Sequence, residues 1–289
     1  MREALKASRR KVQWVDEPAL VLAHEGDGEV FKLTLQAPQI AQMAAPGQFV
    51  MVKVGGVDPL LRRPFSLCEI RPEAGEITLI YRVVGRGTGI LAEAPVGARL
   101  LTMGPLGYSF PDPAVGSGEL LLVGGGLGIP PMVAAATAAV KAGRAVRAIL
   151  GARSARYLAG AAELQALGVR VDLVTDDGTA GERGVVTGPL AAALERASVE
   201  TGDTAGAGVS AEAEASAEVW ACGPEGMLKA VGALAAQHGA PCFLSVERHM
   251  ACGFGACIGC TVPKASGEGF FKACQDGPVF LAEEVTLGV

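Results

Sequence analysis

The chain has 289 residues, half of them hydrophobic, and a formal net charge of −5 at pH 7. This length and hydrophobic content exclude a disordered protein and favour two domains with a small third. Neither a nucleic-acid partner nor a membrane span is expected, because there is no basic block and because glycines and Pro130-Pro131 interrupt the longest apolar run, residues 120–140.

Short apolar runs alternate with turn residues between positions 17 and 110, which is typical of an antiparallel barrel or sandwich. The runs cover residues 19–23, 30–35, 48–54, 65–70 and 77–84. Polar and basic residues interrupt them at 61–66 (LRRPFS) and 81–89 (YRVVGRGTG). Arginine can bind phosphate with two parallel hydrogen bonds, so both inserts are candidate phosphate contacts. On the residues alone, simple surface arginines remain an alternative.

The composition changes at residues 111–118, which are rich in Pro, Gly and Ser, and we place a domain boundary there. Beyond it, strands and helices alternate, which predicts a doubly wound parallel α/β sheet. The expected strands are 119–123, 145–150, 169–175 and 218–221, and the expected helices are 131–141, 155–167, 189–197 and 224–238. Residues 199–217 lack apolar periodicity, so we interpret them as a surface insertion without an assigned role.

Three loops after these strands predict a nucleotide site. Gly124-Gly125-Gly126-Leu127-Gly128 joins a strand to a helix, where glycines let a phosphate approach the backbone and free N–H groups point at it. The spacing is not G-x-G-x-x-G, so close packing alone stays an alternative for this loop. Asp176-Asp177-Gly178 and Cys222-Gly223-Pro224 follow two further strands, and parallel strands bring such loops to one edge. A nicotinamide nucleotide is expected, and the two aspartates favour NAD over NADP. Arg153 and Arg156, which follow a strand end, leave NADP open because they could contact the adenosine phosphates.

Four cysteines near the C-terminus are spaced C-x4-C-x2-C followed by a fourth: Cys252, Cys257, Cys260 and Cys274. This is the plant-type ligand pattern of a [2Fe–2S] cluster. Glycines between the first three allow a tight loop whose N–H groups can point at the sulfurs. We therefore predict these four residues as iron ligands.

A zinc site, a disulfide framework and chance spacing each fit the cysteines less well. A structural zinc site usually has two C-x2-C pairs or a histidine pair, and here a single C-x2-C has only His249 nearby. A disulfide framework suits secreted chains, and no signal peptide is recognised at residues 1–12. Chance spacing of buried cysteines would not bring the glycines with it. Thiolate ligands and the lack of a targeting segment predict a cytoplasmic location.

Several motifs together resemble a known superfamily. Arg63-Pro64-Phe65-Ser66 is similar to the R-x-x-S flavin motif of the ferredoxin–NAD(P)⁺ reductase superfamily, and the predicted barrel, α/β unit and cysteine tail follow that superfamily's order. Within it, GGGLGIPP, TDDGTAGERGVVT, ACGPEGM, CGFGACIGC and CQDGPVF most resemble the electron-transfer subunits of dihydroorotate dehydrogenase B. The resemblance spans nearly the whole chain, apart from the N-terminal extension and the insertion.

The resemblance implies an α+β multidomain oxidoreductase subunit of pyrimidine biosynthesis. Residues 1–113 would be an antiparallel β-barrel FAD domain, 114–243 a parallel-sheet NAD domain, and 244–289 a [2Fe–2S] domain. Electrons of NADH would pass through FAD and the cluster to an FMN-containing dihydroorotate dehydrogenase catalytic subunit, in a heterotetramer of two plus two. The chain itself would not bind dihydroorotate.

Site residues follow from the same resemblance by matching motifs. The flavin contacts would be Arg63, Pro64, Phe65, Ser66, Ile80, Tyr81, Arg82, Gly87 and Thr88. The NAD contacts would be Gly124, Gly125, Gly126, Gly128, Asp176, Asp177, Gly223 and Pro224, with Cys222 as the catalytic residue at the nicotinamide end.

Two other functions remain open from the sequence. A flavin and iron–sulfur reductase that serves ferredoxin, a hydrogenase or a sulfite reductase would carry the same cofactors and differ in its acceptor. A non-enzymatic redox sensor would hold the cluster without rapid NADH turnover.

Overall fold

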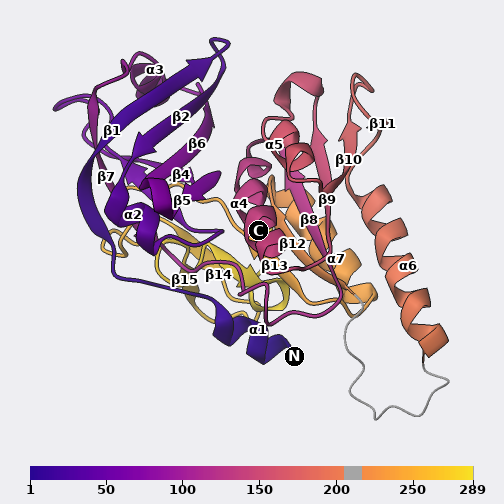
Figure 1. Cartoon of the computed structure of the whole chain (residues 1–289). Coiled ribbons are helices and arrows are strands. Elements are labelled where there is room, and N and C mark those ends of the chain that lie inside the picture. Colours follow the sequence, from indigo (N-terminus) through magenta and orange to yellow (C-terminus); the bar gives the residue numbers. More distant parts are fainter. Residues whose placement is uncertain (205–216, 289) are drawn as a thin grey trace.

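The computed structural model describes residues 1–204 and 217–288, without the side chains of residues 199–204. The described part contains two seven-stranded sheets and a hairpin of β14 (Thr261–Pro263) and β15 (Phe270–Lys272). Figure 1 shows the two sheets side by side, with this hairpin and the helix α1 (Arg2–Ser8) toward the bottom. None of the described helices is both long and apolar enough to span a bilayer.

The first sheet is antiparallel and curled, with strand order β4-β3-β7-β1-β2-β6-β5. Its strands are β1 (Val15–Gly26), β2 (Val30–Gln36), β3 (Phe49–Val52), β4 (Arg63–Ser66), β5 (Glu69–Arg71), β6 (Glu76–Arg82) and β7 (Arg99–Leu106). Short helices α2 (Pro38–Met43) and α3 (Arg86–Ala92) lie in the connections. The antiparallel β unit is confirmed, and it is an open, curled sheet with β4 and β5 at its edges.

The second sheet has the order β11-β10-β9-β8-β12-β13-β16 and is parallel except for β16. Its strands are β8 (Glu119–Gly125), β9 (Val146–Ala152), β10 (Arg170–Thr175), β11 (Glu182–Arg183), β12 (Ala217–Cys222), β13 (Cys242–Ser245) and β16 (Val279–Leu281). The helices are α4 (Pro130–Lys141), α5 (Ala161–Ala166), α6 (Thr187–Thr204) and α7 (Glu225–Gln237).

Both faces of the second sheet are covered by helices. Leu120 and Leu122 belong to the buried cluster that includes α4 and α5, whereas Leu121 and Val123 belong to the cluster that includes α6 and α7. Because successive side chains of a strand point to opposite faces, an uninterrupted apolar strand fits a sheet buried on both sides. The predicted doubly wound arrangement is confirmed.

Two helices differ from the predicted bounds. The helix expected at 155–167 is a 3-10 turn, Ala155–Tyr157, followed by α5, because Gly160 adopts φ +101 and interrupts the helix. The helix expected at 189–197 runs as far as Thr204, since its Ala-rich centre favours continued helix. The predicted insertion therefore begins inside α6, and its residues 205–216 lie outside the described part of the chain.

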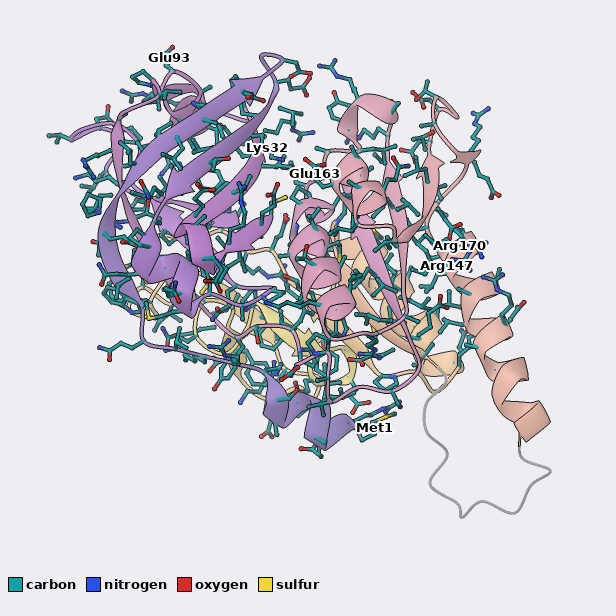
Figure 2. The ribbon with its side chains drawn as sticks, in the orientation of Figure 1. Met1, Lys32, Glu93, Arg147, Glu163 and Arg170 are labelled. Atoms are coloured by element: carbon teal, nitrogen blue, oxygen red, sulfur yellow. The ribbon has the colours of Figure 1, made fainter. Side chains whose placement is uncertain are left out.

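Charged side chains connect the two halves of the molecule. Lys32 of β2 donates to Glu163 of α5 at 2.8 Å and also pairs with Glu69 of β5 at 2.8 Å. Figure 2 labels Lys32 and Glu163 where the first sheet meets α5. Partial burial disfavours the lysine's charge, but the two carboxylates outweigh this effect and raise the pKa of Lys32. The contact fixes the first sheet beside the helix that covers the second.

A buried ion pair lies at the edge of the second sheet where the strands β9 and β12 begin. Arg144 lies 2.8 Å from the Glu218 carboxylate, and the two side chains are 5% and 2% exposed. Arg144 also donates to the Ser117 carbonyl at 2.9 Å, and Trp220 Nε1 donates to Glu218 at 2.6 Å. Neither charge can be hydrated, so each depends on the other.

We expect Arg144→Met to lower the free energy of unfolding by about 3–5 kcal/mol, because it leaves the Glu218 carboxylate buried without its cation. Urea denaturation measures the change. The double variant Arg144→Met with Glu218→Gln is the matched control, and it should regain most of the loss, since no charge is then buried alone. A single variant within about 1 kcal/mol of the parent would mean that the pair contributes as little as a surface ion pair.

Candidate functional site

Two of the predicted nucleotide loops meet where the strand order of the second sheet reverses, between β8 and β12. The loop after β8 packs directly on the loop after β12: a Cβ added at Gly128 would lie 2.1 Å from the Cys222 carbonyl oxygen. One added at Gly125 would lie 2.5 Å from the Met227 sulfur. This reversal point is where doubly wound sheets bind ligands. The structure thus brings the glycine loop and Cys222-Gly223-Pro224 together.

The third loop lies at the same edge but two strands away, after β10. Asp176 donates its N–H to the Ala152 carbonyl at 3.1 Å. The Asp177 carboxylate accepts the hydroxyl and the N–H of Thr179 at 2.6 and 2.9 Å, and these bonds lower the pKa of Asp177. Both aspartates are exposed, and of the two carboxylates only that of Asp177 is held by such a turn among the described residues. Both remain predicted nucleotide contacts.

A cavity of about 630 Å³ lies between the first sheet and the second. Its lining includes most of the predicted flavin residues: Arg63, Pro64, Phe65, Ser66, Ile80, Tyr81, Arg82 and Thr88. Gly87 lies against this group, because a Cβ there would be 2.4 Å from the Arg63 guanidinium. Leu127 of the glycine loop lines the cavity as well. The flavin motif and the nucleotide loop, which are about 60 residues apart in the sequence, thus border one space.

Local contacts hold the loop before α3 in place. The Thr88 hydroxyl accepts the N–H groups of Val84 and Gly85 at 2.9 and 3.2 Å and donates to the Gly85 carbonyl at 3.0 Å. These bonds leave the small residues around Gly87 close to the cavity wall. The Tyr81 side chain has another environment: its hydroxyl bonds His24 Nε2 at 2.8 Å among Phe31 and Phe65, inside the first sheet. Burial raises the pKa of this phenol.

Cys222 is 1% exposed and lies at the end of β12. Burial raises the pKa of its thiol, and the nearby Glu247 raises it further. The thiol is therefore neutral at pH 7. The catalytic role that the resemblance implies for Cys222 at the nicotinamide end stays a prediction.

One segment of the cavity wall, residues 245–250, was not predicted from the sequence. This segment follows β13 at the same edge of the sheet as the three predicted loops. Arg248 in it donates to Glu225 of α7 at 2.9 Å and to the Thr261 carbonyl at 3.2 Å. The charged triplet Glu247-Arg248-His249 directly after a buried strand was the available signal. It was hidden because the cysteine motif begins only three residues later.

We expect Glu247→Gln to stabilise the cofactor-free chain more at pH 7.5 than at pH 4.5. Glu247 lines the 630 Å³ cavity, and although its side chain is exposed to solvent, the surrounding protein atoms desolvate the carboxyl and raise its pKa above the ordinary 4.5. A raised pKa means that wild-type stability is retained below the unfolded pKa and lost as the pH rises through the folded one. Glutamine does not ionise and escapes this loss. Thermal unfolding at both pH values, with the exposed Glu195→Gln of α6 as control, measures the difference, and an equal shift at both would contradict it.

The four predicted cluster cysteines lie as two pairs. Cys260 Sγ and Cys274 Sγ are 3.3 Å apart and buried, and the Cys257 N–H points at Cys252 Sγ from 3.4 Å. Partial burial opposes ionisation of Cys252, but the N–H groups of Cys257 and Phe254 lower its pKa to about 7. Burial and the neighbouring Cys260 raise the pKa of Cys274 to about 12.

The donor set fits a two-iron cluster, which takes two thiolates on each iron. Within residues 1–204 and 217–288, no three His, Cys, Asp or Glu side chains converge on a single metal position. The glycines have the expected part: Gly253 and Gly255 adopt φ +79 and +88, and a Cβ on either would lie 2.6 Å from a neighbouring side chain. The tight turn that the sequence predicts for this loop is therefore present in the structure.

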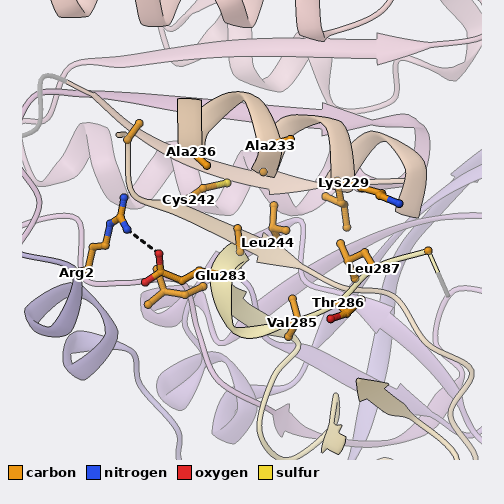
Figure 3. A pocket seen from close by; sticks show the side chains of 16 residues that line it. Arg2, Lys229, Ala233, Ala236, Cys242, Leu244, Glu283, Val285, Thr286 and Leu287 are labelled. Atoms are coloured by element: carbon orange, nitrogen blue, oxygen red, sulfur yellow. Dashed lines mark hydrogen bonds and ion pairs between the residues drawn. The ribbon is translucent and has the colours of Figure 1, made fainter. Parts of the chain in front are cut away.

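A second cavity, of about 520 Å³, lies between α7 and the C-terminal segment (Figure 3). Cys242 and Leu244 of β13 line it, with Lys229 toward one end and the Arg2–Glu283 ion pair, 2.6 Å, toward the other. It shares no residue with the wall of the 630 Å³ cavity. It is therefore separate from the nucleotide site.

Comparison with known proteins gives a consistent result. The family model of the iron–sulfur cluster binding domain of dihydroorotate dehydrogenase B matches residues 247–286. The dihydroorotate dehydrogenase B (NAD⁺) electron transfer subunit of Geobacillus thermodenitrificans is 40% identical over 260 residues, which cover 89% of this chain and 93% of that protein. The subunit of Enterococcus faecalis is 37% identical with the same coverage.

Solved structures agree with the architecture. An NADH-dependent reduced ferredoxin-NADP oxidoreductase superposes with a TM-score of 0.74 and 30% identity, over 93% of this chain and 90% of that one. The ferredoxin NADP⁺ reductase of Neisseria gonorrhoeae, solved with FAD and NADP, superposes with a TM-score of 0.58 over 79% of this chain and 93% of that one. At 16% identity, the latter supports the fold alone.

Proposed function

The chain belongs to the family of dihydroorotate dehydrogenase B electron transfer subunits, and from this premise we propose that it carries electrons between NAD and a catalytic subunit that oxidises dihydroorotate to orotate. This oxidation releases two electrons, which the chain passes to NAD⁺, and NADH drives the same path in reverse with orotate as the acceptor. Its cofactors are FAD, a [2Fe–2S] cluster and NAD. When bound, the flavin and the cluster together supply the conversion of a two-electron hydride into single electrons.

One observation carries the proposal. Residues 245–250 line the cavity that the flavin motif also borders, and the same segment leads without interruption into Cys252. The nucleotide site and the cysteine loop are therefore built on one continuous stretch of chain. Such a stretch brings a two-electron site and a one-electron site within a short distance, as electron delivery requires.

The residues at the cavity, Arg63 to Ser66 and Ile80 to Arg82 with Gly87 and Thr88, would bind FAD. The glycine loop before α4 would bind the NAD phosphates, helped by the close approach that its glycines allow and by the partial positive charge at that helix N-terminus, where Pro130 and Pro131 provide no N–H groups. Asp176 would accept a ribose hydroxyl and disfavour a 2′-phosphate. Cys222, Gly223 and Pro224 would border the nicotinamide.

The domain division 1–113, 114–243 and 244–289 belongs to the same proposal. The curled sheet would form the FAD unit, the parallel sheet the NAD unit, and the cysteine loop with its hairpin the cluster unit. Residues of the third range also contribute β16 to the second sheet, where it pairs with β13. This pairing would hold the cluster unit rigidly beside the NAD unit.

The partner would dock on the cysteine loop. Large apolar side chains are exposed around it: Leu60 at 77%, Ile258 at 65% and Phe254 at 43%. A shallow cavity of about 320 Å³, bordered by Leu60, Phe254 and Cys252, lies among them. Apolar groups gathered on a surface are typical of protein interfaces. We propose an FMN-containing catalytic subunit here, two copies of each subunit in the complex, and a cytoplasmic location, where thiolates stay reduced.

The experiment is an anaerobic titration of the purified chain with NADH, followed by addition of the FMN-containing catalytic subunit. Flavin and cluster absorbance should both decrease with NADH, and NADH should then support reduction of added orotate to dihydroorotate by the catalytic subunit. A second candidate, a reductase that serves ferredoxin, is favoured by the similarity to the ferredoxin-NADP oxidoreductase structure. Reduction of ferredoxin in place of the catalytic subunit would decide for that function, and flavin left oxidised by NADH would refute both.

A further inference from the structure

The first fourteen residues lie along the cluster unit and are attached to it at several points (Figure 1). We call residues 1–14 the N-terminal strap. Leu5 of α1 is fully buried in the core of the second sheet. Arg2 and Lys6 form ion pairs with Glu283 and Glu284. The beginning of the strap is therefore fixed to the rest of the protein by one buried side chain and two ion pairs.

Lys11 of the strap contacts the residue next to a cluster ligand. Its Nζ donates to the carbonyl oxygen and the side-chain oxygen of Gln275 at 2.7 and 3.1 Å. Gln275 directly follows Cys274. The same Nζ lies 5.2 Å from the centre of the Tyr108 ring, which limits where the lysine can turn. A positive charge is thus held at the residue that follows the predicted ligand Cys274.

Gln275 in turn touches the other half of the cluster site. A Cβ at Gly255 would lie 2.6 Å from Cγ of Gln275, so this side chain packs on the backbone between Cys252 and Cys257. Lys11 therefore fixes a side chain that spans both cysteine pairs. Lys11 is thus linked to the cysteine loop through two direct contacts, Lys11 with Gln275 and Gln275 with Gly255.

Trp14 makes a separate contact with the cysteine loop, at Phe254, the residue before Gly255. Its ring centre lies 5.9 Å from that of Phe254, with the planes at 35°. Trp14 also borders the shallow cavity next to Cys252. The indole lies against part of this side of the loop, and both rings stay partly exposed, Trp14 at 39% and Phe254 at 43%.

From these contacts we infer that the N-terminal strap positions and shields the [2Fe–2S] cluster, with Lys11 acting through Gln275 and Trp14 acting through Phe254. The inference rests on the proposed function, since it requires the cluster. Hydrogen bonds, net charge and solvent exposure around the sulfurs set a cluster's reduction potential. The lysine charge favours the reduced, more negative cluster, and the indole limits solvent access.

The test of Lys11 is Lys11→Met in the full chain after anaerobic reconstitution. We expect a more negative reduction potential of the cluster and about tenfold faster loss of its visible absorbance to a chelator, as for other residues that support metal ligands. Lys11→Arg should restore the potential because it keeps the charge. Arg10→Met removes the neighbouring charge, whose side chain has no hydrogen bond or ion pair among the described residues, and should behave as wild type.

The test of Trp14 is Trp14→Ala, compared with Phe270→Ala, which removes an exposed ring of the same cluster unit. We expect faster cluster loss and an altered electron paramagnetic resonance spectrum only for the first, and recovery with Trp14→Phe. Variants that retain wild-type potential, spectrum and loss rate would overturn the inference. Wild-type chain that takes up no cluster would instead refute the proposed function, so the two failures are distinct.

Discussion

Cys274→Ala is expected to leave the chain without its cluster while the flavin remains bound. Cys274 Sγ lies 3.3 Å from Cys260 Sγ in a buried position, so removal of one sulfur leaves one iron with a single thiolate of its pair. No other cysteine among the described residues lies in that pair. Iron and sulfide content should fall to a small fraction of the wild-type value, and transfer of electrons to the catalytic subunit should stop.

The flavin site of this variant serves as the internal reference. The cavity that we assign to FAD has no cluster cysteine in its wall, so the flavin bands should still bleach on addition of NADH. Cys242→Ala is the matched control, because Cys242 is also buried and lies outside the cysteine motif. Full iron and sulfide in Cys274→Ala would show that the ligand assignment is wrong.

Gly128→Ala is expected to damage the nucleotide site and the stability of the second sheet together. The added Cβ would lie 2.1 Å from the Cys222 carbonyl oxygen, 2.3 Å from its carbon and 2.5 Å from the Gly223 nitrogen. All three are backbone atoms, so no side chain can turn away to make room. We expect a loss of about 3 kcal/mol in the free energy of unfolding, at the upper end for overpacking.

The same change separates the two loops that border the strand reversal, and we expect flavin reduction by NADH to slow about 100-fold because a displaced nucleotide reacts poorly. Stopped-flow absorbance measures the rate, and urea denaturation the stability. Gly226→Ala in α7 is the control: no atom lies within 4 Å of its added Cβ, and alanine favours a helix over glycine. Wild-type rate and stability in Gly128→Ala would falsify the close packing of these loops.

Much of the fold was predictable because its signals are local. The alternation of strands and helices after residue 118 predicted a doubly wound sheet, and the clusters on its two faces, around Leu120 and Leu121, confirm it. Helix ends were less predictable, as α6 shows, because a helix end depends on packing as well as on propensity.

The sequence by itself determined the chemistry of this protein: the cysteine spacing, the glycine loop and the arginine motif are short patterns whose residue types limit what they can bind. The tertiary structure alone decided three other features. It placed residues 245–250 in the wall of the nucleotide cavity, turned the Tyr81 hydroxyl toward His24, and laid Lys11 against Gln275. Each of these contacts joins segments far apart in the chain, and no local pattern encodes a contact that arises only when whole sheets pack together.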